Sequence, residues 1–189
     1  MSLSSLFKTT RVTKHRVGKF GRDRKGSAAV EFALVAPIFF ALLFAVLETG
    51  FVFFAGQTLE TVTQDVARLV MTGQAQNIGY TQVQFKDEVC KRLTMLFDCK
   101  NGIYVDVQSF PSFTSVTIPD AIDANKHFIP TMQYKPGNAC DVVVMRMFYQ
   151  WPLYVTGLGY DMSNIAGNKR LLIATAAFRN EPYGTASCT

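Results

Sequence analysis

The sequence has few residues of the kinds that build catalytic or metal centres. Of its two histidines, His15 lies in a basic N-terminal stretch and His127 in a polar segment without a nucleophile motif nearby. The four cysteines form no close Cys-x-x-Cys pair and have no histidine companion, as a zinc site would favour. Asp120 and Asp123 are too few carboxylates to predict a calcium site. An enzyme is therefore disfavoured, and neither a metal nor a cofactor is predicted.

Internal repeats and low-complexity segments are also absent from the sequence. A chain of 189 residues fits about one domain of ordinary size. A second large hydrophobic core is not expected.

Positive charge is concentrated at the N-terminal end of the chain, although the formal net charge is only +5. Residues 1–26 contain eight Lys and Arg against the single acid Asp23, a net charge of +7 that leaves −2 for residues 27–189. The eight cations are Lys8, Arg11, Lys14, Arg16, Lys19, Arg22, Arg24 and Lys25. The basic character of the protein therefore belongs to this segment.

Charges of both signs are missing from residues 32–47, which are rich in Ala, Leu, Val and Phe. Residues 27–56 contain only Glu31 and Glu48 as charged side chains and exceed the roughly 20 residues that cross a hydrocarbon core as a helix. Cations beside a spanning helix stay in the cytoplasm. We therefore predict a cytoplasmic leader over residues 1–26, a transmembrane helix in membrane lipid over 27–56, and an external domain over 57–189.

Two other interpretations of the N-terminal region are weaker. A basic arm can bind nucleic acid, because phosphates attract clustered Lys and Arg. Here an apolar helix follows at once and explains the cations, so nucleic acid is not a predicted partner. A removable secretory signal has an apolar core of roughly 7 to 15 residues and a small-x-small cleavage site. The apolar run here is longer, and no clear Ala-x-Ala follows it.

The acidic residue within the apolar segment is the most informative feature. An ionised carboxylate is costly in hydrocarbon, so Glu31 is expected to have a partner or a function. Its context is Arg24-Lys-Gly-Ser-Ala-Ala-Val-Glu-Phe32. A Gly between a basic leader and an apolar helix, followed by Glu-Phe, resembles the processing site of type IV prepilins. The next residues, Ala-Leu-Val-Ala-Pro37, make the chain similar to the TadE-like family of tight-adherence pilus proteins.

This resemblance implies a role for each residue of the motif. In that family a prepilin peptidase cuts after the Gly on the cytoplasmic face, which places the cut between Gly26 and Ser27. Glu31 and Phe32 are implied in peptidase recognition and assembly. Glu31 would pair with the Ser27 amine of a neighbouring subunit, neutralising two charges that are costly in lipid. The alternative is that Glu31 reaches the membrane interface without a partner.

Other residues of the apolar segment carry weaker signals. Pro37 removes a helical hydrogen bond and is expected to bend the helix. Gly50 and Gly56 could each bend it further. Glu48, near the outer end, is expected to reach water.

The remaining pattern predicts an α+β, pilin-like domain. Apolar residues at helical spacing, Leu59 to Val70, continue the first helix to about residue 72 and are expected to face the core. A turn is predicted over residues 73–79 and a second helix over 81–97. Alternating apolar residues predict antiparallel strands near 103–108, 141–151 and 170–178, with a further strand near 113–118. Long irregular segments separate the strands near 120–138 and 152–168.

All four cysteines follow the predicted membrane segment, in the compartment where disulfides persist. Four cysteines allow three pairings. We favour Cys90 with Cys99 and Cys140 with Cys188. A straight helix would hold the first two about 13 Å apart, whereas bridged Cα atoms lie within about 7 Å. The second helix must therefore end before Cys99.

The resemblance and the size of the external domain favour a minor pilin or pseudopilin of a tight-adherence pilus, acting in assembly, initiation or surface adhesion. A major pilin of such a system would be far shorter. The implied partners are prepilin peptidase, other pilins and pseudopilins, and the inner-membrane assembly platform. The implied location is the bacterial inner membrane, with the N-terminus cytoplasmic and the domain periplasmic, and after assembly the extracellular pilus. The alternative is a permanently anchored periplasmic scaffold or binding protein that is never processed.

Overall fold

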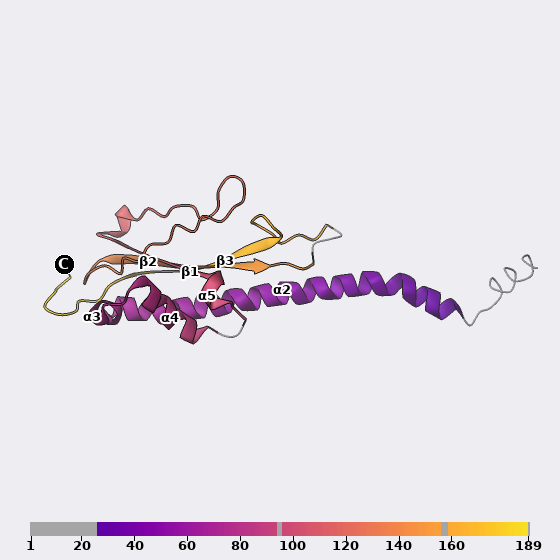
Figure 1. Cartoon of the computed structure of the whole chain (residues 1–189), viewed down its shortest axis with the longest axis horizontal. Helices are drawn as coiled ribbons and strands as arrows, with labels where there is room; N and C mark the ends of the chain where they lie inside the picture. Colours follow the sequence, from indigo (N-terminus) through magenta and orange to yellow (C-terminus); the bar gives the residue numbers. More distant parts are fainter. Residues whose placement is uncertain (1–25, 94–95, 156–158, 189) are drawn as a thin grey trace, which may run out of the picture. The chain divides into compact units, whose positions relative to one another are not determined.

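The computed structural model of the chain describes residues 26–93, 96–155 and 159–188. Two compact units are present, one ending at Phe44 and the other beginning at Ala45. Apart from Gly26, the leader predicted over residues 1–26 lies outside the described residues. The elements, shown in Figure 1, are α2 (Ser27–Met71), α3 (Gln74–Ile78), α4 (Gln82–Arg92), α5 (Cys99–Gly102), β1 (Ile103–Phe110), η2 (Phe113–Ser115), β2 (Val142–Pro152) and β3 (Lys169–Arg179). The α+β prediction is confirmed.

The helix α2 runs without interruption through Pro37, Gly50 and Gly56. Its end at Met71 confirms the predicted end near residue 72. Among the described residues, α2 is the one helix that is long and apolar enough to cross a membrane. None of its most apolar stretch is buried within the chain. Its C-terminal part has the predicted core-facing stripe, since Leu59, Val62, Val66 and Val70 are buried.

The short helices α3 and α4 differ from the prediction. The helix α3 occupies the segment predicted as a turn, and Gly73 and Gly79 flank it with φ values of 75° and 72°. Glycine adopts this left-handed conformation readily, which favours it on both sides of this short helix. The helix α4 follows a capping box between Thr81 and Gln84 and ends at Arg92, earlier than the predicted residue 97.

The three strands form one antiparallel sheet in the order β1-β2-β3. Asp106 pairs with Arg146, and Arg146 pairs with Thr175 in the next strand. The strand predicted near residues 113–118 is wrong, because η2 and an irregular segment occupy it. There the Ser112 and Ser115 side chains and backbones hydrogen-bond each other and favour a turn over a strand.

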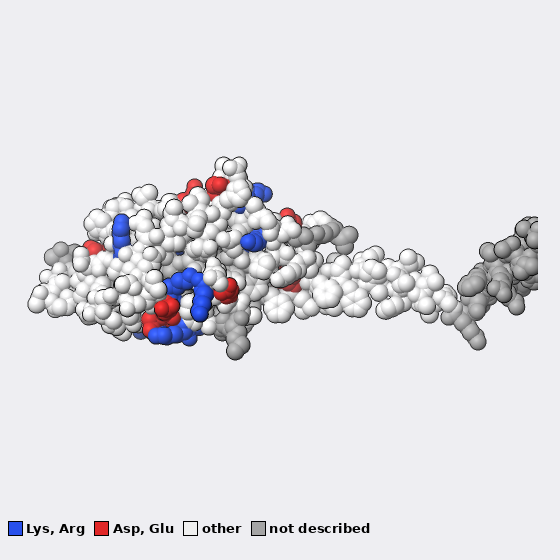
Figure 2. Space-filling view, in the orientation of Figure 1, with Lys and Arg blue, Asp and Glu red and all other residues white. Residues whose placement is uncertain are grey.

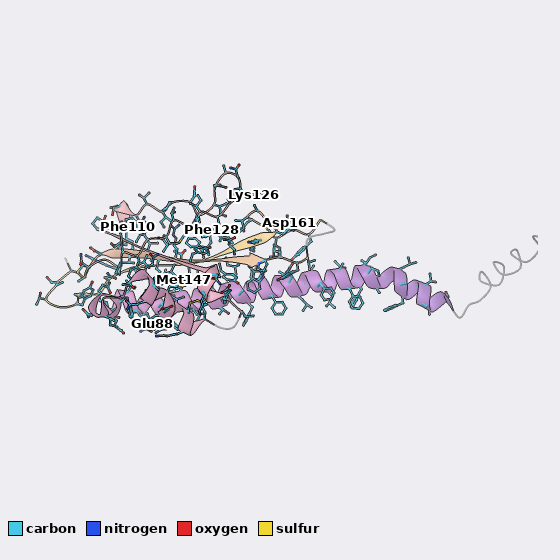
Figure 3. All side chains as sticks on the ribbon, in the orientation of Figure 1. Glu88, Phe110, Lys126, Phe128, Met147 and Asp161 are labelled. Carbon is cyan, nitrogen blue, oxygen red and sulfur yellow. A yellow bond between two sulfur atoms is a disulfide. The ribbon has the colours of Figure 1, made fainter. Side chains whose placement is uncertain are left out.

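Both faces of the sheet are covered within the unit that begins at Ala45. On one face, Val105, Met145 and Met147 belong to the same buried cluster as the apolar stripe of α2 and two residues of α4, Phe85 and Val89. On the other face, Phe148 packs with Ile165 and Leu171 beneath loop residues that include Phe128. Figure 3 shows Met147 on the α2 side of the sheet and Phe128 on the opposite side. The sheet is therefore the middle layer between helices and long loops.

Two disulfides join segments of this unit. Cys90 near the end of α4 is bonded to Cys99 at the start of α5, with Cα atoms 5.7 Å apart. Cys140, just before β2, is bonded to Cys188 in the C-terminal tail, with Cα atoms 5.3 Å apart. This is the pairing that the sequence favours, and α4 does end before Cys99.

A buried ion pair holds the loop layer to the sheet. Arg146 Nη2 donates to Asp106 Oδ2 at 2.7 Å, and the Arg146 Nη1 atom donates to the Pro119 carbonyl at 2.9 Å. Asp106 Oδ1 accepts from the Gln133 backbone N–H at 2.9 Å. Since the Asp106 side chain is only 1% exposed, it is paired with Arg146 and not with water. The pair therefore ties the long connection between β1 and β2 to the sheet at two points, Pro119 and Gln133.

Candidate functional site

The predicted processing site lies at the N-terminal end of α2. Gly26 is exposed, directly before the first residue of the helix. A Cβ atom built on Gly26 would meet nothing within 4 Å, and its φ is outside the left-handed region. Neither packing nor backbone conformation in the described part of the chain requires glycine here. A need for glycine would therefore come from a partner that approaches the backbone closely.

The Glu31 carboxylate lies one helical turn beyond Ser27. Residues four apart share one side of a helix, so the two face the same direction. Both are exposed, as is Phe32. Among the residues that the structure describes, Glu31 has no hydrogen bond or ion pair. The carboxylate is thus available to a group outside the described chain.

The surface around Glu31 is apolar on every side of the helix. None of residues 26–44 is buried. In Figure 2 the visible face of this part of α2 shows no Lys, Arg, Asp or Glu. A helix that is apolar all round is typical of a membrane span or of the interior of a helical assembly. The exposed large side chains are Val30, Phe32, Leu34, Val35, Ile38, Phe39, Phe40, Leu42, Leu43, Phe44, Val46 and Leu47.

Glu48, the second carboxylate of α2, does not reach water as expected. It is 8% exposed and binds the loop that follows β2. Glu48 Oε1 accepts from the Tyr154 backbone N–H at 2.5 Å, and both carboxylate oxygens accept from the Val155 N–H at 3.2 and 3.1 Å. The prediction of a solvated Glu48 is wrong, because backbone amides take the place of water at its carboxylate.

Hydrogen bonds to Tyr160 hold the same loop at the neighbouring turn of α2. The Thr49 hydroxyl donates to the Ala45 carbonyl at 2.7 Å and is hydrogen-bonded to the Tyr160 hydroxyl. Tyr160 also lies within 3.3 Å of the Ala45 carbonyl. Together with the bonds of Glu48, these contacts hold Tyr154, Val155 and Tyr160 against residues 45–49.

One sequence signal could have identified Glu48. The buried positions of α2 continue at spacings of three and four residues from Leu59 back through Ala55 and Val52 to Glu48. This spacing is that of one helix face, so Glu48 lies on the core-facing stripe. Its partner could not be found in this way, because Tyr154 is 106 residues further along the chain.

The polar loop that contains His127 has a local structural role. Asp123 Oδ1 accepts from the His127 and Asn125 backbone N–H groups at 2.7 and 2.8 Å. These bonds, chiefly the one from His127, lower the pKa of Asp123. No group of three or more His, Cys, Asp or Glu side chains suited to a metal occurs among residues 26–93, 96–155 and 159–188.

Comparison with known proteins gives one family match. Residues 26–68 match the family model of the TadE-like proteins. The matched segment begins at Gly26, includes Glu31 and Glu48, and covers nearly all of α2. No curated protein and no solved structure matches the chain. The TadE-like resemblance of the N-terminal motif is confirmed, and involvement in a tight-adherence pilus is the function that it indicates.

Proposed function

We propose that this protein is a minor pilin or pseudopilin of a tight-adherence pilus, processed by prepilin peptidase between Gly26 and Ser27. The observation that carries the proposal is the exposed Glu31 without a partner, on an all-round apolar helix within the TadE-like match. The processed subunit takes part in pilus assembly, initiation or adhesion. Other pilins and the inner-membrane assembly platform are its proposed partners.

The charge distribution supports a single orientation in the inner membrane. The +7 leader stays in the cytoplasm, and the domain from Ala45 onward, with its two disulfides, stands in the oxidising periplasm. Cutting after Gly26 removes all eight leader cations. The shortened chain then has no cationic segment at the cytoplasmic end of α2 and can leave the membrane in a filament.

Processing and assembly depend on different residues of the motif. Cleavage creates an amino group on Ser27, one turn before Glu31. In lipid, an unpaired ammonium and an unpaired carboxylate are both costly, so pairing between subunits selects one axial register. Among the described residues Glu31 has no hydrogen bond or ion pair, which favours a partner from a neighbouring subunit.

The N-terminal residue of the membrane-purified protein tests this proposal. In cells that contain prepilin peptidase, intact mass and N-terminal analysis should show a chain beginning at Ser27. Gly26→Ala adds a methyl group at the scissile position, so unprocessed protein should accumulate in the inner membrane. Gly50→Ala is the matched control, because a Cβ at Gly50 also meets nothing within 4 Å. It should be cleaved like the wild type.

A mature wild-type protein that still begins at Met1 would contradict the proposal. It would favour the alternative of a permanently anchored periplasmic scaffold or binding protein. Gly26→Ala cleaved as fast as Gly50→Ala would instead show that the peptidase does not need a bare backbone at this position.

A further inference from the structure

The contacts of Glu48 and Tyr160 place a loop at a defined height along α2. Leu153, Tyr154 and Val155 follow β2, and the Tyr154 and Val155 amides are bound by Glu48. Since Tyr160 is also bonded at Thr49 and Ala45, residues 154–155 and Tyr160 lie beside residues 45–49 of the helix. In a membrane, these loop residues would therefore lie at the same depth as residues 45–49 of the helix.

This placement conflicts with a membrane span that extends to Gly56. Irregular backbone does not occur where it would face hydrocarbon with unpaired polar groups. Glu48 satisfies the Tyr154 and Val155 amides, but among the described residues no hydrogen bond reaches the carbonyls of these two residues. At 1.5 Å per residue, residues 27–56 rise roughly 45 Å, whereas a hydrocarbon core is about 30 Å thick. Residues 27–47 rise roughly 31 Å, which fits the core. The position of the loop and the length of the helix both place the outer end of the hydrocarbon near Leu47.

Aromatic side chains are exposed where this boundary would fall. The Tyr154 side chain points outward and is 84% exposed, although its backbone amide is held by Glu48. On α2, just beyond Glu48, Phe51, Phe53 and Phe54 are 57%, 66% and 58% exposed. Tyrosine is enriched at membrane interfaces, because its ring is apolar and its hydroxyl is polar.

We propose that the loop at residues 153–155 lies in the phospholipid headgroup region, with Tyr154 as an interfacial anchor and Glu48 at the outer edge of the hydrocarbon. The inference deepens the proposed function, since it takes α2 as the membrane anchor. The Glu48 carboxylate then has a second consequence. By fastening the loop to α2, it seats the periplasmic domain directly on the lipid surface before assembly.

Depth-dependent fluorescence quenching tests this placement with the full chain in phosphatidylcholine and phosphatidylglycerol vesicles. The protein has a single tryptophan, so Trp151→Phe gives a background for one new indole at a time. The test variant is Tyr154→Trp. Phe40→Trp, within the apolar part of α2, is the membrane control. Phe113→Trp is the distant control, because it follows the end of β1 at Phe110, at the opposite end of the sheet from Pro152.

The inference predicts three different profiles. Lipids brominated near the headgroup should quench the Tyr154→Trp indole more strongly than lipids brominated near the chain ends. Phe40→Trp should be quenched by bromines within the acyl chains, and Phe113→Trp by neither lipid. Quenching of Tyr154→Trp as weak as that of Phe113→Trp would overturn the inference, and so would quenching mainly by deep bromines.

The controls separate this inference from the proposed function. If Phe40→Trp is quenched and Tyr154→Trp is not, the anchor stands and the interfacial loop is wrong. If Phe40→Trp is not quenched, the membrane anchor itself is wrong. If Trp151→Phe fails to fold, Tyr154→Trp can be made with Trp151 retained. The difference in quenching between that variant and the wild type then answers the same question.

Discussion

Glu31 and Glu48 are the same chemical group in the same helix, but their surroundings are opposite. Glu31 is exposed and has no hydrogen bond or ion pair among the described residues, whereas Glu48 is 8% exposed and accepts hydrogen bonds from two backbone amides. The surroundings of α2 change in the same way, since none of residues 26–44 is buried and the buried stripe begins at Glu48.

The difference distinguishes a carboxylate that stabilises the fold, Glu48, from one that is available to another molecule, Glu31. A carboxylate whose partners lie in its own chain contributes to the stability of the domain. A carboxylate without such partners contributes little to stability, and its presence in an apolar helix supports the proposed pairing with a neighbouring subunit. Carboxylates elsewhere in the chain extend this comparison, from Asp106 in the core to Asp123 in a loop.

Asp106→Ala should give the largest loss of stability among the carboxylate substitutions. It leaves Arg146 buried without its counter-charge, so the free energy of unfolding should fall by about 3 to 5 kcal/mol. Denaturant titration of the detergent-solubilised full chain measures the loss. Asp120→Ala, an exposed loop carboxylate, is the control and should change stability by less than about 0.5 kcal/mol. Equal losses of stability in the two variants would show that the buried Asp106–Arg146 pair does not stabilise the domain.

Glu48→Ala should have a smaller but clear effect on stability. It leaves the Tyr154 and Val155 amides without an acceptor, at a cost of about 2 kcal/mol. Glu31→Ala is the matched control in the same helix and should stay within about 0.5 kcal/mol of the wild type. Amide hydrogen exchange should show faster exchange at Tyr154 and Val155 in Glu48→Ala alone. An unchanged exchange rate there would mean that Glu48 does not hold the loop.

The hydrogen bonds of Asp123 should give the smallest effect, visible only in acid. Its pKa lies below the ordinary value of 3.8, chiefly because of the His127 amide, so its contribution is present above that value. The contribution is lost as the pH falls through the lowered pKa. Protection of the Asn125 and His127 amides, corrected for intrinsic exchange, should therefore fall at acid pH. In Asp123→Ala the protection should be low at every pH, and a matching acid-dependent fall in that variant would contradict the assignment.

Local patterns were enough to predict the helix to about residue 72 and the three strands of the sheet. Apolar residues at spacings of three, four or two residues decide these elements, and such patterns can be read without knowing the fold. The strand near residues 113–118 failed because local serine hydrogen bonds favoured η2. The segment 73–79 was predicted as a turn because its two flanking glycines mask the short helix between them.

Contacts between distant residues limited the prediction of the site. Glu48 and Tyr154 are 106 residues apart, and Asp106 and Arg146 are 40 apart. Neither partner can be named until the sheet and its loops are in place. The prediction of Gly26 and Glu31 as site residues needs no such contact, because it rests on a local signal, a glycine and a glutamate at a fixed spacing in front of an apolar run.

A comparison of Glu31→Gln with Glu48→Gln tests whether Glu31 serves assembly and Glu48 serves folding. Recruitment of each variant into sheared pilus fractions is measured by blotting, with leader removal followed in parallel. Glu31→Gln should be cleaved and folded normally but recruited roughly tenfold less or worse, since the loss of little more than 1 kcal/mol suffices for that factor. Glu48→Gln should be less stable, yet its folded fraction should be recruited normally. Recruitment of Glu31→Gln at the wild-type level would contradict the pairing role of Glu31. Glu31 would then be an interfacial residue without a role in assembly.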